Sequence, residues 1–445
     1  GRGRAPPHPP PRRALAEPVV TGDAAPERNP RAILARQAEG RIAALVPLRD
    51  ERMSQSAFAY YRGTAACMAS DLATLPHSGI LVPSCGDAHA ANFGFYASPQ
   101  RTLVFDLNDF DESAWAPWEW DVKRLATSFV LAGRHTSRDP AVTERATREA
   151  TAAYLRALER LVQVAPTIRY FTHYDVGQVL DTLDKSSRKA LRQAIADAEK
   201  RTGERAARRL TTRDAAGALR FVETPPAMVE VDDATGTAAL ELTTAYRRST
   251  NIDIAQLLEQ YRVADVARRA VGVGSVGTRC YIAALEDGDG HTLILQMKQA
   301  SASVLEEYGG IAQPFALLAE IEGLSGPDSG GQGARVVAMQ RVLQAASDPF
   351  LGHVRGQNGD FYVRQFHDMK GGIDTDVIDD DAFVTYAQAC GIVLARAHAQ
   401  SPAAAEVVGY AGGGKVVTDA ITAWADAYAD VAIADHAAFV AALAQ

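Results

Sequence analysis

Two neighbouring polar stretches restrict the fold of this chain more than any other feature. GDAHAANFG occupies residues 86–94, and VFDLNDFDES follows at 104–113. Four carboxylates fall within seven positions of the second stretch: Asp106, Asp109, Asp111 and Glu112. Like charges this close repel one another and resist burial unless a counter-charge neutralises them. One interpretation is a solvated turn rich in Asp and Asn; the other is a site for a metal ion and phosphate.

Length and composition exclude several classes of protein. The 445 residues suggest two to three domains, and the formal charge of −8 gives no general attraction to nucleic acid or anionic membranes. The four cysteines lack CxxC spacing, which favours a reducing compartment over a disulfide framework or a structural zinc site. No apolar run approaches the ~20 residues of a membrane helix, and we see no signal peptide. We therefore expect a cytoplasmic protein; the oligomeric state cannot be read from the sequence.

The periodicity of apolar residues predicts both helices and strands. Residues 1–30 are rich in Pro and Arg and predict a disordered or loosely draped arm. Helices are expected at 31–48, 56–75 (with Ser56 as N-cap), 117–134, most of 141–220, 251–270, 333–348, 381–400 and 419–443. Strands are expected at 79–85, 101–109 and 361–366, with a hairpin within 271–300.

A glycine-rich turn opens this hairpin. GVGSVG spans residues 272–277 and contains Gly272, Gly274, Ser275 and Gly277. Glycines let backbone N–H groups approach phosphate oxygens closely. Lys298 lies on the second following strand among apolar residues, where a lysine is costly unless it meets an anion. A glycine-rich hairpin followed by a strand with Lys is the arrangement that covers ATP in protein kinases, although a plain structural hairpin is the alternative.

Such a lysine needs a carboxylate partner on a nearby helix. Glu306 and its neighbour Glu307 are candidates, and Glu320 and Glu322 lie further along the chain. The sequence does not decide which of them pairs with Lys298.

The first polar stretch has the spacing of a catalytic loop. In kinases an Asp acts on the substrate hydroxyl, and an Asn five residues later holds magnesium. Asp87 and Asn92 have this separation. His89 is expected to contact phosphate or to orient Asp87, with a structural hydrogen-bonded role as the alternative.

The second polar stretch supplies the later metal-binding acid. Asp109 is the first choice, Asp106 is the alternative, and Asp111 offers a second metal contact. Magnesium prefers hard oxygen ligands and keeps several waters, so a few carboxylates and one amide suffice. A magnesium ion would also neutralise the repulsion within the cluster.

Eight ordered motifs together resemble the bacterial family called domain of unknown function 2252. They are RMSQSAFAYYRG, GDAHAANFG, FDLNDFDES, PWEWDVKRL, GVGSVGTRCY, QMKQA, QAASDPFLG and FYVRQFHDMKG, and the resemblance runs from about residue 30 to the C-terminus. It implies a relation to kinase-like phosphotransferases, in which Asp121 corresponds to the Asp of the helix that follows the metal-binding segment.

The order of the motifs differs from that of ordinary kinases, because Asp87 precedes Gly272. We therefore expect an α+β, kinase-like two-lobe fold that is circularly permuted, which is tolerable when the chain ends lie close together. The expected parts are a disordered arm (1–30), a helical catalytic lobe with metal-binding loops (31–260), a β-rich nucleotide-binding lobe (261–370) and C-terminal helices that complete the catalytic lobe (371–445). Two unrelated domains are the alternative.

These features predict an ATP- and Mg²⁺-dependent phosphotransferase with an unknown hydroxyl acceptor, either a small molecule or a protein. Nucleotidyl transfer is possible with the same residues. The alternatives are a non-catalytic nucleotide-binding protein and a metal-dependent phosphoesterase, although only the GDAH element of the latter is present. Arg62 either clamps phosphate or pairs with a carboxylate.

Overall fold

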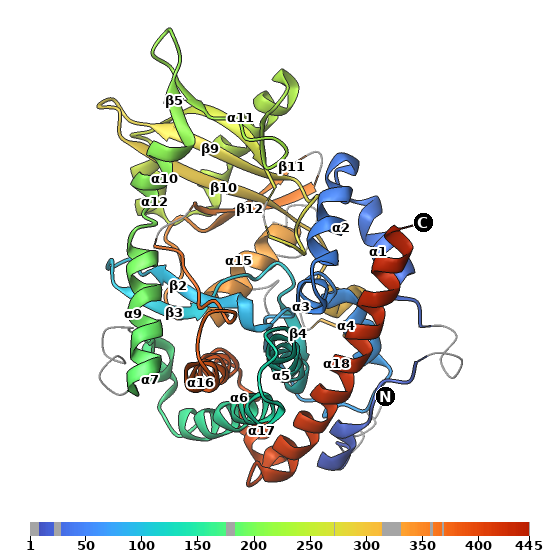
Figure 1. Cartoon of the computed structure of the whole chain (residues 1–445). Coiled ribbons are helices and arrows are strands. Elements are labelled where there is room, and N and C mark those ends of the chain that lie inside the picture. Colours follow the sequence, from blue (N-terminus) through green and yellow to red (C-terminus); the bar gives the residue numbers. More distant parts are fainter. Residues whose placement is uncertain are drawn as a thin grey trace, which may run out of the picture.

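The computed structural model of the chain describes residues 9–21, 28–174, 183–270, 272–313, 331–356, 359–366 and 369–444. The fold is α+β, as the sequence predicts, with a sheet-bearing half above a larger helical half in Figure 1. Among the helices of the described residues, none combines the length and the apolar character that crossing a bilayer requires.

The upper half is organised around an antiparallel sheet of six strands in the order β11–β12–β10–β9–β8–β7. The strands are β7 (Met228–Glu230), β8 (Arg262–Arg269), β9 (Cys280–Glu286), β10 (Thr292–Ala300), β11 (Gly352–Gly356) and β12 (Gly359–Gln365). The hairpin expected within 271–300 is formed by β9 and β10. Lys298 on β10 lies opposite Cys280 on one side and Tyr362 on the other.

The two faces of this sheet have different neighbours. The covering elements are α10 (Gly203–Leu210), β5 (Thr211–Arg213), β6 (Leu219–Phe221), α11 (Asp233–Tyr246) and α12 (Ile252–Leu258). Leu285 and Leu295 face α11 and α12, whereas Ile294 belongs to the cluster formed with α10 and β6. Because side chains alternate along a strand, Lys298 shares the face of Ile294, and its Nζ contacts carboxylates of the helical half.

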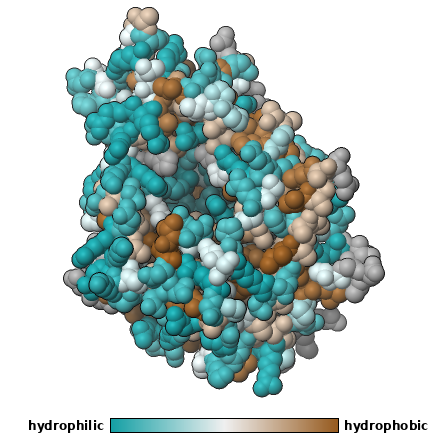
Figure 2. All heavy atoms as spheres, in the orientation of Figure 1, coloured by the Kyte–Doolittle hydropathy of each residue, from teal (hydrophilic) through white to brown (hydrophobic). Residues whose placement is uncertain are grey.

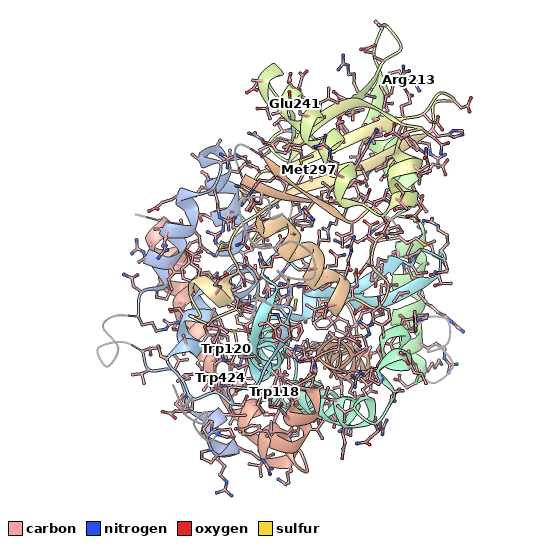
Figure 3. The ribbon with its side chains drawn as sticks, turned by 180° about the vertical axis from the view of Figure 1, so that it is seen from behind. Trp118, Trp120, Arg213, Glu241, Met297 and Trp424 are labelled. Atoms are coloured by element: carbon pink, nitrogen blue, oxygen red, sulfur yellow. The ribbon has the colours of Figure 1, made fainter. Side chains whose placement is uncertain are left out.

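The helical half combines segments encoded before and after the sheet. Its central helices are α5 (Trp118–His135), α6 (Pro140–Leu161), α16 (Asp380–His398), α17 (Ala404–Ala411) and α18 (Lys415–Leu443). Side chains of all five helices share one core with Trp118 and Trp424, both buried. Figure 3 shows these tryptophans and Trp120 in the helical half, with Met297 in the sheet. Residues 380–443 are therefore part of the same packed unit as residues 118–161.

Smaller elements lie between and around the halves. Two short antiparallel sheets pair β1 (Leu81–Ser84) with β4 (Ala114–Pro117) and β2 (Phe93–Ala97) with β3 (Leu103–Leu107). The remaining α-helices are α1 (Pro30–Glu39), α2 (Val46–Ser54), α3 (Ala57–Arg62), α4 (Ala65–Ala73), α7 (Pro166–Phe171), α9 (Lys185–Glu199), α13 (Val304–Glu307) and α15 (Gly331–Leu343). The 3₁₀ helices are η1 (Arg12–Ala16), η3 (Ala43–Leu45), η4 (Ala90–Asn92) and η6 (Arg247–Ser249). In Figure 1, α15 lies between the sheet and the helical half.

Several of the expected helices differ from the structure. The helix expected at 31–48 is divided, because α1 ends at Glu39 and α2 begins at Val46. The helix expected at 251–270 ends at Leu258, and the following residues form β8 because they pair with β7 and β9. Backbone pairing to two neighbours outweighs a local pattern of this kind. Ser56 caps α3 as predicted, accepting a hydrogen bond from Ala59 N at 3.0 Å. That helix stops at Gly63, whose missing Cβ makes room for the side chain of Met53.

The N-terminal segment also differs from the arm that we expect to be disordered. Within 9–21, η1 packs on α18 and Leu15 is completely buried. Arg28 forms ion pairs with Asp71 at 2.8 Å and with Asp435 of α18 at 2.7 Å. The described part of this segment is therefore packed: Leu15 is buried, and Tyr410 of α17 donates to Pro10 O at 3.1 Å.

The ion pairs of Arg28 should contribute to stability. Replacing Arg28 by Met leaves Asp71, whose side chain is 7% exposed, without its counter-charge. We expect the free energy of unfolding to fall by about 3 kcal/mol. Arg134→Met is the matched control, because Arg134 also joins two aspartates of α18, Asp426 and Asp430, but these are 67% and 73% exposed. Its loss should stay below about 1 kcal/mol in urea unfolding. Equal losses in the two variants would contradict this account.

Candidate functional site

The two halves meet at the amine of Lys298. Its Nζ lies 2.5 Å from Asp111 Oδ2 and 3.3 Å from Asp109 Oδ1, and the side chain is 1% exposed. Burial alone would lower the pKa of Lys298, but Asp109 and Asp111 raise it well above its usual value. Burial would conversely raise the pKa of Asp109, and Lys298 with Arg364 holds it below its usual range. The charged pair joins β10 to the segment after β3.

The segment 109–113 is fixed from several directions. Tyr362 on β12 donates its hydroxyl to Asp111 Oδ1 at 2.5 Å. Arg335 on α15 is buried and donates to the backbone carbonyls of Asp111 (2.9 Å), Ser113 and Ser301 (2.8 Å). The positions of both aspartates therefore depend on the sheet and on α15.

Asp121, in the first turn of α5, orients the loop that follows β1. Its carboxylate accepts hydrogen bonds from Cys85 N (2.6 Å) and Gly86 N (2.9 Å), and its Oδ2 lies 3.2 Å from His398 Nε2 at the end of α16. Gly86 has φ +78°, and a Cβ there would lie 2.1 Å from Glu112 O, so only glycine fits. The loop is thereby placed against the segment that carries the aspartates.

Asp87 follows this loop and is held by a buried arginine. Arg124, one turn beyond Asp121 on α5, donates from Nε to Asp87 Oδ1 at 2.6 Å, while the side chain of Asp87 remains 22% exposed. His89 Nε2 lies 3.6 Å from Asp87 Oδ2, and burial lowers the pKa of His89 to about 4. At neutral pH His89 is therefore uncharged. Asn92 Nδ2 donates to the carbonyls of Asp87 (3.0 Å) and Asp109 (3.1 Å), so this amide connects the two polar stretches.

The glycine-rich turn closes over the same region. Gly272 and Gly277 have φ values of +69° and +92°. The turn is anchored by hydrogen bonds from Arg52 to Gly272 O (2.5 Å) and from Arg41 to Val276 O (2.5 Å). A Cβ on Gly274 would lie 3.2 Å from the carbonyl oxygen of Arg62, so the tip of the turn lies close to the end of α3.

Two chambers adjoin this arrangement. The first has a volume of about 580 Å³ and the second about 560 Å³. Five residues line both of them: Asn108, Asp109, Gly272, Ser275 and Lys370. Figure 2 shows the surface hollowed between the sheet-bearing part and the helical part. A ligand that spans both chambers would pass between Asp109 and the glycine-rich turn.

The linings of the two chambers differ. The first includes Lys298, the aromatic residues Tyr96, Phe350 and Phe366, and the arginines Arg52, Arg101, Arg269 and Arg364. The second includes Asp87, His89, Asn92, Asp111, Glu112, Gly274, Arg41 and Arg62. The first chamber is suited to a polyanion with an aromatic group, and the second contains the candidate base.

The structure separates two predicted residues from the others. Asp106 lines neither chamber: it is 2% exposed and accepts hydrogen bonds from Leu107 N and Ala345 N, both at 2.8 Å. Its position on β3 turns it away from Asp109, so it is not a ligand of the same ion. Glu306 is exposed on α13, and the carboxylates that pair with Lys298 are Asp109 and Asp111 instead. Glu307 pairs with Arg36 at 2.9 Å, whereas Glu320 and Glu322 lie outside the described residues.

Gly277 belongs to the turn but lines neither chamber, because it packs on the side chain of Arg41. Several cationic residues of the site were missed by sequence reasoning, among them Arg364 and Lys370. Arg364 lies on β12 and Lys370 follows it; the charge of Arg364, and then burial, lowers the pKa of Lys370 to about 7. The motif FYVRQFHDMKG contains both residues, but nothing local shows that they face the aspartates.

The donors at the junction of the chambers fit magnesium. No cluster of three or more His, Cys, Asp or Glu side chains suited to a metal ion occurs in the described part of the chain. Magnesium needs fewer protein ligands, since water and substrate phosphates complete its shell. Asp109 and Asn92 line the second chamber together and offer hard oxygen atoms of this kind.

The comparisons with known proteins give one match. The model of the family described as "Uncharacterized protein conserved in bacteria (DUF2252)" matches residues 41–442, and the chain belongs to this family. No curated protein and no solved structure matches the chain.

Glu112 should give the site a pH-dependent stability. Burial raises the pKa of Glu112 to about 7, from an ordinary value near 4.5. Between these values the folded carboxyl keeps a proton that the unfolded chain releases, so stability falls as the pH rises through this window.

Glu112→Gln keeps an acceptor for Val304 N, which donates to Glu112 at 3.0 Å, but it removes the titration. As the pH rises from 4.5 to 7.5, the free energy of unfolding of the variant should increase relative to that of the native chain by on the order of 1 to 3 kcal/mol. Urea unfolding at several pH values measures this gain, with Glu159→Gln at an exposed position of α6 as the control. If the free energies of unfolding of Glu112→Gln and of the native chain change in parallel with pH, Glu112 is not the titrating group.

Proposed function

We propose that this member of the DUF2252 family is a kinase-like phosphotransferase with a circularly permuted two-lobe fold, which uses ATP and Mg²⁺ to phosphorylate a hydroxyl group. The observation that carries the proposal is the meeting of Lys298 with Asp109 and Asp111 beneath the glycine-rich turn. The groups come from the two halves of the molecule, at the junction of two chambers. Kinases gather the same set of groups around the ATP phosphates.

The order of elements supports this proposal. The glycine-rich turn joins β8 to β9, Lys298 follows on β10, and β11 and β12 complete the sheet beside α15. In the helical half, a loop with Asp87 and Asn92 precedes the β2–β3 hairpin, and Asp109 follows two residues after β3. Within each half, the elements follow the order expected for the corresponding lobe of a kinase. The order of the two halves is reversed, because the proposed catalytic lobe comes first in the chain.

The end of α16 gives independent support for permutation. GIVLARAHAQ (391–400), at the end of α16, resembles the phosphotransferase helix that leads directly into the catalytic loop. His398, at the end of α16, contacts Asp121, which in turn binds the backbone of Cys85 and Gly86. The two segments are adjacent in space although more than 300 positions separate residue 398 from residue 85. A chain cut between them would produce the observed order.

In this proposal each group has a defined role. The backbone of 272–277 and Lys298 hold the ATP phosphates, and the arginines of the first chamber add positive charge around them. Asp109 and Asn92 would hold magnesium, which neutralises phosphate charge and aligns the phosphoryl group when it is bound. The aromatic residues Phe350 and Phe366 offer surfaces for the base.

Transfer requires an acceptor in the second chamber. Asp87 accepts the hydrogen bond of the acceptor hydroxyl and takes its proton as the oxygen bonds to the γ-phosphorus. The bond between this phosphorus and the bridging oxygen of ATP breaks, and ADP leaves with that oxygen. Arg124 keeps Asp87 oriented through its 2.6 Å contact.

One observation favours a second candidate, a non-catalytic nucleotide-binding protein. Asp87 is already paired with Arg124, and Lys298 engages both aspartates. Such a protein would bind ATP in the first chamber without transferring phosphate.

Two substitutions separate these functions. Asp87→Asn should lower transfer of labelled γ-phosphate from ATP to a bacterial metabolite extract by at least about 100-fold, because the base is lost. Its affinity for a non-hydrolysable ATP analogue with Mg²⁺ should stay within about twofold of the native value by calorimetry. Lys298→Met should weaken that affinity by about tenfold or more, because a charge-assisted phosphate contact is lost.

Lys415→Met is the matched control, since Lys415 is 84% exposed on α18 and should change neither measurement. ATP binding without turnover in the native chain would favour the non-catalytic candidate. Absence of nucleotide affinity together with EDTA-sensitive hydrolysis of a phosphoester would exclude both candidates.

A further inference from the structure

We propose that the second chamber takes an acceptor that carries its own anionic group, such as a phosphate or a carboxylate, which Arg62 and Arg41 bind next to Asp87. This proposal rests on the proposed function, because it concerns the acceptor of that reaction. It specifies a class of substrate, namely a small anionic molecule with a hydroxyl group.

Four of the five acids that line the second chamber have counter-charges, and the fifth is Glu112. Asp87 is paired with Arg124, and Asp109 and Asp111 are paired with Lys298. At the rim, Glu307 is paired with Arg36. Glu112 accepts a hydrogen bond from Val304 N at 3.0 Å. None of the ion pairs of these acids involves Arg41 or Arg62.

Arg62 and Arg41 line the chamber and pair with no carboxylate in the described part of the chain. The Nε of each is buried and has no hydrogen-bond partner among the described residues. The only described hydrogen bond from the Arg41 guanidinium goes to Val276 O. A half-buried guanidinium whose Nε has no partner is unfavourable, and an anionic ligand would offset this cost with charge-assisted hydrogen bonds.

The position of Arg62 connects this anion to the chemistry. Burial lowers the pKa of Arg62, and the negative charge of Asp87 partly opposes this shift. Arg62 also acts on the pKa of His89 beside Asp87. The backbone of Arg62 lies against Gly274 at the tip of the glycine-rich turn. An anion on Arg62 would therefore share the second chamber with the tip of the glycine-rich turn and the candidate base.

The size of the chamber favours a small molecule. Its volume of about 560 Å³ lies within the range of small-ligand sites. Because an arginine fork matches phosphate and carboxylate oxygens in a bidentate manner, inorganic phosphate is a suitable probe of the subsite.

The test measures phosphate binding while the nucleotide site is filled. With a saturating non-hydrolysable ATP analogue and Mg²⁺, inorganic phosphate is titrated into the protein by calorimetry. We expect a phosphate site whose affinity falls about tenfold or more in Arg62→Gln and in Arg41→Gln, and falls less in Arg62→Lys, which keeps the charge. Affinity for the ATP analogue should be unchanged in Arg62→Gln, whereas Arg41→Gln also removes an anchor of the glycine-rich turn. Arg134→Gln, a surface arginine of α5, is the control, and thermal melting verifies that each variant is folded.

Two results would overturn the inference: phosphate affinity that does not respond to Arg62→Gln, or phosphate that binds only when the analogue is absent. Loss of analogue affinity in Arg62→Gln would also overturn it, because Arg62 would then hold the γ-phosphate of ATP instead.

Failure of the proposed function gives a different pattern. If the native chain does not bind the ATP analogue, phosphate is titrated alone into the native chain and into Lys298→Met. Phosphate binding that depends on Arg62 but not on Lys298 would then support the anion subsite while the phosphotransferase proposal fails. Analogue binding without a phosphate site would support the phosphotransferase and exclude the anionic acceptor.

Discussion

The buried amine of Lys298 is the interaction on which the rest of the structure depends. An uncompensated ammonium group at 1% exposure is costly, so β10 must meet carboxylates from another part of the chain. Asp109 and Asp111 provide them, and the contact fixes the sheet against the helical half. Arg335 and Tyr362 hold these aspartates in turn. The repulsion within the acidic stretch is relieved by the same contact, because one cation is shared between two acids that lie two residues apart.

The local parts of this arrangement could be predicted from the sequence. A lysine within an apolar strand after a glycine-rich turn indicates an anion partner, and the hairpin of β9 and β10 follows from turn residues between two apolar runs. The five-residue spacing of Asp87 and Asn92 depends only on a short loop, and in the structure the amide of Asn92 bridges the backbones of Asp87 and Asp109. These features depend on residues that are close together in the chain, so the spacing along the sequence determines where the side chains point.

Features that depend on distant partners could not be predicted. Asp106 and Asp109 look equivalent in sequence, but pairing of β2 with β3 turns Asp106 toward Ala345 and away from the chambers. The strand β8 was expected to be helical, because its two pairing partners are not visible in its own pattern. Arg41 and Arg62 belong to helices and a connection that fold against a turn more than 200 residues later. In each case the tertiary neighbour, not the local propensity, determines the role of the residue.

The central claim is that both halves of the molecule bind one polyphosphate between them. A crystal structure of the chain with a non-hydrolysable ATP analogue and Mg²⁺ tests this most directly. The account predicts the phosphates between residues 272–277 and Asp109, with a phosphate oxygen within hydrogen-bond distance of Lys298 Nζ. A nucleotide bound elsewhere, with the Lys298–Asp109–Asp111 contact intact and no ligand beside it, would contradict the account.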